Sequence, residues 1–137
     1  MIVVDANLLV VLVSGDVRKP LVRQKFAEWI QQDQEIYAPE LARYEFSNGL
    51  TRLIVGAAFD INKVQAAWEE ISLLSINYQP VSNAAKIVGI AMKLKRQNAY
   101  DAAYIALAES LGAELWTMDG PLYRNASGLG YPVKLLT

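Results

Sequence analysis

The chain has 137 residues, a formal net charge of −1 and a hydrophobic fraction of 53%. This length is typical of one domain and the apolar content is ample for a buried core, so we expect a single domain over residues 1–137. A net charge so close to zero provides no overall basic field that would indicate nucleic-acid binding, although a local basic groove stays compatible with it.

The sequence contains no cysteine and no histidine. The missing cysteines exclude disulfides and thiolate zinc sites, and nothing in the chain indicates secretion. The missing histidines exclude serine–histidine and cysteine–histidine catalysis. The apolar run at 8–13 is too short to span a bilayer, and no basic segment precedes it. We therefore expect a cytoplasmic protein with no signal peptide and no membrane helix.

Short apolar runs and amphipathic segments alternate through the first half of the chain. Pro20 fits the first turn of a helix, and Gly56 is a typical residue just after a helix end. The elements predicted here are a strand at 2–4, helices at 7–13 and 20–32, a strand at 35–38, and a helix from Pro39 to 55.

The second half continues the alternation. Asp60, Ser82 and Asn98 are predicted to cap the helices that follow them. The elements expected are helices at 61–74, 82–97 and 99–111, a connection or short strand at 75–80, a strand at 113–118, a short helix, and a strand at 133–136. Short strands separated by helices indicate an α/β fold with a parallel sheet covered by helices.

Acidic residues stand where a site of such a sheet is expected. Asp5 and Asp119 each follow a predicted strand, and ligands of open α/β sheets bind beyond the carboxyl ends of the strands. Asp101 lies in the first turn of its helix, where the helix dipole alone would also explain a negative charge. Each acid has such a structural alternative when taken singly.

Glu45 lies on the border of the apolar stripe of its helix, so it can point across a cleft. The alternative is a solvated glutamate on the helix face. Glu40 competes with it but has a ready explanation in the first helical turn. Grouped carboxylates repel one another strongly, and a divalent cation removes that conflict. Mg²⁺ and Mn²⁺ prefer oxygen ligands and can activate water for phosphodiester hydrolysis without histidine.

Four segments in order carry a resemblance to a known family: Val3-Val4-Asp5-Ala6-Asn7, Glu45-Phe46-Ser47-Asn48-Gly49-Leu50, residues 100–108 and Leu115-Trp116-Thr117-Met118-Asp119. The chain resembles PIN-domain ribonucleases, most closely the VapC-type toxins of toxin–antitoxin pairs. The resemblance implies a three-layer α/β/α sandwich with a short central parallel sheet. It also implies Mg²⁺- or Mn²⁺-dependent cleavage of single-stranded or looped RNA, a homodimer, and an antitoxin that covers the site.

Carried over by position, the resemblance makes Asp5, Glu45 and Asp101 the central catalytic and metal-binding acids. Asp119 would be the fourth acid, and Asn7 and Thr117 would be supporting polar groups. These roles are what the family likeness implies at the matching positions of this sequence.

Basic residues precede Asp101, and Lys95 and Arg96 could position phosphates there, although a solvated helix face explains them as well. A haloacid-dehalogenase-like phosphatase would need a second aspartate where this chain has Asn7. A non-catalytic binding module, either receiver-like or a degenerate PIN domain, is the remaining alternative. No acid of the PIN pattern is missing from this chain.

Overall fold

A parallel sheet of five short strands forms the centre of the structure, a computed structural model that describes residues 1–96 and 98–137. The strand order is β3-β2-β1-β4-β5, and every neighbouring pair is parallel. The strands are β1 (Ile2–Val4), β2 (Ile36–Pro39), β3 (Asn77–Gln79), β4 (Glu114–Thr117) and β5 (Val133–Leu135). β1 is therefore central, and the chain builds the sheet outward from it in both directions.

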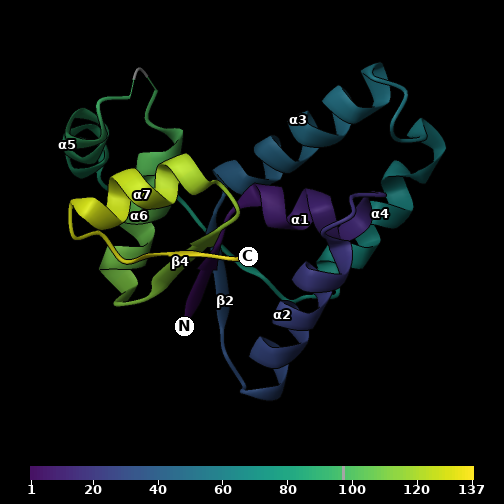
Figure 1. The fold of residues 1–137 in the computed structure, drawn as a ribbon, viewed down its shortest axis with the longest axis horizontal. Helices are drawn as coiled ribbons and strands as arrows, with labels where there is room; N and C mark the ends of the chain where they lie inside the picture. The colour runs from purple at the N-terminus through teal and green to yellow at the C-terminus, as the bar shows by residue number, and fades with distance from the viewer. Residues whose placement is uncertain (97) are drawn as a thin grey trace.

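Helices cover both faces of this sheet (Figure 1). They are α1 (Ala6–Val13), α2 (Lys19–Gln31), α3 (Leu41–Val55), the short 3₁₀ helix η1 (Ile61–Lys63), α4 (Val64–Ser72), α5 (Ala84–Leu94), α6 (Tyr100–Leu111) and α7 (Gly120–Gly128). In Figure 1, α1 to α4 lie to one side of the sheet and α5 to α7 to the other, with α6 in contact with β1, β2 and β4. The expected α/β/α sandwich with a parallel sheet is confirmed. None of the helices within 1–96 and 98–137 has the length and apolar character required to cross a membrane.

The core forms where the sheet meets its helices. Val3 and Val4 have no exposed surface, and neither does Ile105 of α6. On the α2 side the Trp116 ring of β4 lies edge-on to Trp29, with ring centroids 5.7 Å apart. Such pairs contribute about 1 kcal/mol beyond the area they bury. The short strands are thus held mainly by packing from both layers.

Helices α1 and α3 approach each other closely at Gly49. A Cβ atom at this position would lie 2.8 Å from Cγ2 of Val10, closer than real carbon atoms come. Glycine is therefore what allows α3, which carries Glu45, to lie against α1, which carries Asn7. This contact therefore lies between two walls of the region beyond β1.

Several expected helix boundaries are wrong. The helix predicted at 61–74 begins as the 3₁₀ helix η1, which runs directly into α4, and α4 ends at Ser72. Asp60 does cap, but it accepts from the backbone N–H of Asn62 at the start of η1. Asn83, not Ser82, caps α5 by accepting from the Lys86 N–H at 3.0 Å.

The ends of the other elements shift by one or a few residues. α5 ends at Leu94 because Lys95 takes a left-handed conformation with φ of 58°; Gln97, the predicted end, lies outside the described residues. α6 begins at Tyr100, whose N–H donates to Asn98 Oδ1 at 3.3 Å. Pro39 is the last residue of β2 and not the start of α3.

Candidate active site

Asp5 lies at the carboxyl edge of the sheet, where β1 passes into α1. Its N–H continues the pairing of β1 with β4 by donating to the Trp116 carbonyl at 3.2 Å. Its carboxylate caps α1, with Oδ1 accepting from the Asn7 N–H at 3.3 Å and Oδ2 from the Thr117 hydroxyl at 2.9 Å. These three contacts fix the carboxylate at the end of the two central strands.

Thr117 connects two of the predicted acids. Its side chain is completely buried at the end of β4. The hydroxyl donates to Asp5 and accepts from the backbone N–H of Asp119 at 3.0 Å. Asp119 in turn caps α7 through Oδ1, which accepts from the Leu122 N–H at 3.0 Å. One threonine therefore connects the carboxylate after β1 with the backbone of the acid after β4. Its role as a supporting group of the site stays a prediction.

Glu45 reaches the same region from α3. Its Oε1 accepts a hydrogen bond of 2.6 Å from the hydroxyl of Tyr104 on α6. Tyr104 is almost fully buried, and it lies one helical turn after Asp101. The sequence analysis did not assign a role to Tyr104. Its spacing of three residues from Asp101 places both on one face of α6 and was the available signal.

The electrostatics show that the acids act on one another. Burial raises the pKa of Asp5 to about 6, its hydrogen bonds from Thr117 and Asn7 oppose this rise, and the charges of Asp101 and Glu45 add to it. Burial also raises the pKa of Glu45, with Asp101 adding to the rise. The pKa of Asp101 is raised by burial and by Asp119.

The structure thus brings Asp5, Glu45 and Asp101 into one region and places Asp119 beside Asp101. Among the residues described, however, no three acids are grouped as ligands of a single metal ion. Each of Asp5, Glu45 and Asp119 is held instead by the hydrogen bonds given above. The donor set still fits Mg²⁺ or Mn²⁺, because these ions take one or two carboxylates and keep several waters.

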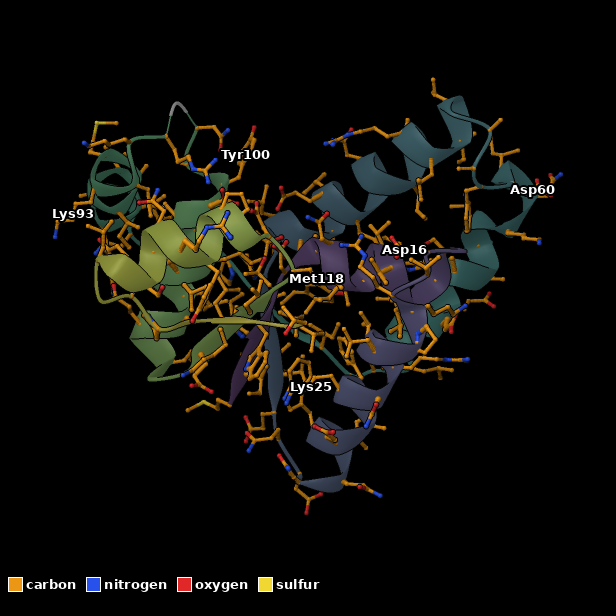
Figure 2. All side chains as sticks on the ribbon, viewed as in Figure 1. Asp16, Lys25, Asp60, Lys93, Tyr100 and Met118 are labelled. Atoms are coloured by element: carbon orange, nitrogen blue, oxygen red, sulfur yellow. The ribbon has the colours of Figure 1, made fainter. Side chains whose placement is uncertain are left out.

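The basic residues that precede Asp101 differ in their relation to the acids. Arg96 lowers the pKa of Asp101, so its charge reaches the site. Lys95 is exposed in the turn after α5, and no carboxylate of the described chain lies within salt-bridge distance of it. Lys93 projects from the outer edge of α5, far from Met118 at the end of β4 (Figure 2). Arg96 remains a candidate for phosphate positioning.

A pocket of about 620 Å³ opens beside the acids. It lies between α1, α3, the loop after α1 and the turn from β4 to α7. Asn7 and Asp119 line it where it meets the acids, and Arg18 and Arg52 also belong to its wall. The sequence analysis did not single out Arg52, although it lies seven residues after Glu45 and so on the same face of α3.

Known proteins resemble this chain in sequence and in fold. The family model described as PIN domain matches residues 2–127. Ribonuclease VapC3 of Pyrobaculum aerophilum is 31% identical over 137 residues, which cover 96% of this chain and 98% of the relative. The crystal structure of PAE2754 from Pyrobaculum aerophilum superposes with a TM-score of 0.70 at 21% identity, covering 93% of this chain and 80% of that one. This structural likeness concerns the fold alone. The family match and the identity to the ribonuclease together show that the chain belongs to the PIN-domain family.

Proposed function

We propose that this protein is a metal-dependent endoribonuclease that hydrolyses phosphodiester bonds of single-stranded or looped RNA. The observation that carries the proposal is the position of Asp5 at the end of central strand β1, where Glu45 and Asp101 both repel its carboxylate. Such a group is unfavourable without a counter-ion, because each added negative charge raises the cost of ionising the others. Membership of the PIN family and the 31% sequence identity to Ribonuclease VapC3 also support this proposal.

The acids have complementary parts in this reaction. We assign Asp5, Glu45, Asp101 and Asp119 to metal binding, directly or through water, and to orienting the attacking water. The chemistry that a bound Mg²⁺ or Mn²⁺ supplies here is a more acidic water and a stabilised phosphoryl oxygen. Thr117 and Tyr104 hold two of the carboxylates in place, and Arg96 carries positive charge for the substrate phosphate.

We further propose that the protein is the toxin of a toxin–antitoxin pair and acts in the cytoplasm as a homodimer. The support is the relative, which is a VapC protein by name and matches this chain over nearly its whole length. A cognate antitoxin that covers the acids would then hold the enzyme inactive. Without the antitoxin, the enzyme would cleave cellular RNA and harm the cell that makes it.

The proposal is tested by cleavage of a panel of structured RNAs with Mg²⁺, with Mn²⁺ and with EDTA. We expect cleavage with either ion and none with EDTA. Asp5→Asn and Asp101→Asn should each lower the rate by about a hundredfold or more. Glu109→Gln is the matched control, since Glu109 is on the same helix as Asp101 but is exposed and pairs with Lys86 at 3.7 Å.

The outcome for these variants decides the assignment. Cleavage at the wild-type rate in both Asp5→Asn and Asp101→Asn would contradict the site. Loss of cleavage in the Glu109→Gln control as well would point to a general effect of charge or folding. Absence of cleavage of any RNA by pure, antitoxin-free protein would favour a binding module over an enzyme.

A further inference from the structure

The pocket beside the acids has two kinds of lining. Val10 of α1, Leu53 of α3 and Met118 after β4 are apolar, whereas other lining side chains are charged or amides. Its volume of about 620 Å³ lies within the range of small-ligand sites. Asn7 and Asp119 form its boundary with the candidate active site. A molecule that occupies both regions must therefore have an apolar or aromatic part next to a group that binds at the acids.

The two arginines of the pocket differ in their availability. The charge of Arg18 is neutralised by Asp16. The Asp16 carboxylate accepts from Arg18 Nε at 2.9 Å, from Arg18 Nη2 at 2.8 Å and from the Arg18 backbone N–H at 2.8 Å. Arg52 is exposed, and none of the carboxylates in residues 1–96 and 98–137 lies within salt-bridge distance of it. Arg52 is therefore the cation of the pocket wall that is available to bind an anionic ligand.

Helix α3 fixes the direction from the acids to this cation. Glu45 and Arg52 are seven residues apart, which places them within about 20° on the helix face and ~10 Å apart along its axis. A strand whose phosphate lies at Glu45 would therefore run along α3 toward Arg52.

We propose that this pocket binds the nucleotide next to the cleaved bond. Its base or ribose lies against Val10, Leu53 and Met118, and Arg52 binds the following phosphate. A guanidinium suits this task because its planar donors match two phosphate oxygens. Contacts of this kind position a strand without reading its sequence. The inference rests on the proposed ribonuclease function and adds the direction in which the RNA leaves the acids.

The test measures binding in an Asp5→Asn background, where RNA is not consumed. The probe is a fluorescent single-stranded oligoribonucleotide of mixed sequence, followed by anisotropy. Arg52→Ala should weaken binding about tenfold and reduce the salt dependence by about 0.7 in the log–log slope, as for one lost phosphate contact. Arg52→Gln, which keeps most of the side-chain length but not the charge, should show the same loss.

Arg43→Ala is the matched control on the same helix. Arg43 is nine residues before Arg52, on the opposite face of α3, where its guanidinium lies 4.3 Å from the centre of the Tyr78 ring. The Arg43→Ala variant should bind the probe as tightly as the parent protein does. A dinucleoside monophosphate, which has no phosphate beyond the reacting one, should bind equally well with or without Arg52→Ala.

Unchanged affinity and salt dependence in Arg52→Ala would refute the subsite, even when the wild-type protein cleaves RNA. A loss in Arg52→Ala that Arg52→Gln does not reproduce would refute the phosphate contact. The nuclease proposal can also fail while the binding proposal holds. In that case the wild-type protein cleaves no RNA, but its RNA binding still depends on Arg52.

Discussion

The hydroxyl of Tyr104 donates a hydrogen bond of 2.6 Å to Oε1 of Glu45, and so joins two helices that belong to different layers of the sandwich. Burial raises the pKa of this phenol far above its ordinary value, and the nearby charges of Asp5 and Glu45 raise it further. The hydroxyl therefore stays protonated at neutral pH and donates to the Glu45 carboxylate. The position of Glu45 is determined by α6 as well as by its own helix.

Removal of this hydroxyl is expected to impair Glu45 without loss of the fold. Tyr104→Phe should lower the cleavage rate about tenfold and weaken Mn²⁺ binding, with a loss of about 1 kcal/mol in unfolding free energy. Rates, Mn²⁺ titration by electron paramagnetic resonance, and urea unfolding measure the three effects. Tyr44→Phe is the control, because Tyr44 is exposed on α3. Wild-type Mn²⁺ affinity and rate in Tyr104→Phe would show that Glu45 needs no such support.

Thr117 should be sensitive to the loss of its hydroxyl but tolerant of the loss of its methyl group. Thr117→Val keeps the shape, yet it leaves Asp5 and the Asp119 N–H without their buried partner, at a cost of about 1–3 kcal/mol. Cleavage should fall with it. Thr117→Ser retains the hydroxyl and should recover most of the activity and of the unfolding free energy. Equal behaviour of the valine and serine variants in both assays would contradict this role.

Asp5 should make the metal-free protein less stable as the pH rises. Burial raises its pKa from 3.8 to about 6, so the unfolded chain loses this proton at lower pH than the folded protein does. Stability is then highest below pH 4 as far as this group is concerned, and it declines by up to about 3 kcal/mol as the pH rises through 6. The raised pKa values of Glu45 and Asp101 act in the same direction.

Asp5→Asn should therefore be more stable than the wild-type protein in EDTA above about pH 6, although it is inactive. Urea unfolding of both proteins on either side of the transition measures the difference. Saturating Mg²⁺ should stabilise the wild-type protein more than the variant, because the ion compensates the carboxylate charge. A variant that is less stable than the wild-type protein at high pH would mean that the buried Asp5 carboxylate does not destabilise the fold.

The contact of Gly49 with Val10 predicts an unusual response to alanine. In an exposed helix interior Gly→Ala stabilises by about 1 kcal/mol. Gly89→Ala on α5, where nothing lies within 4 Å of the added carbon, should show this gain. Gly49→Ala should instead destabilise by about 1–2 kcal/mol, because the new carbon meets Val10 at 2.8 Å.

Val10→Ala combined with Gly49→Ala should recover part of that loss. A double-mutant cycle by urea unfolding measures the coupling between the two positions. Cleavage should fall in Gly49→Ala and return partly in the double variant, since α3 carries Glu45. Additive effects of the two substitutions would show that the loss in Gly49→Ala does not come from its contact with Val10.

Much of the architecture could be predicted because its signals are local. β1 and β4 are short apolar runs ended by polar residues, and parallel strands place such ends at one edge of a sheet. That logic alone puts Asp5 and Asp119 at the carboxyl edge of the sheet. The choice between Ser82 and Asn83 as the cap of α5 could not be made in this way, because adjacent residues offered similar chemistry.

The partners of the acids depend on how distant helices cross. Tyr104 and Glu45 are 59 residues apart, and no periodicity within either helix indicates that they meet. Only the pocket that α3 forms with α1 and the turn after β4 makes Arg52 a candidate, since its position on α3 also suits a solvated surface residue. Local patterns thus predicted the acids, and tertiary packing determined what holds and surrounds them.

The hydrogen bond between Thr117 and Asp5 joins residues 112 positions apart, and β4 is the neighbour of β1 on that side of the sheet. Synthesis on the ribosome proceeds from the N-terminus, so Asp5 emerges well before Thr117. A growing chain accordingly has the first carboxylate long before it has the strand that orients it. The candidate active site can therefore be assembled only after β4 has left the ribosome.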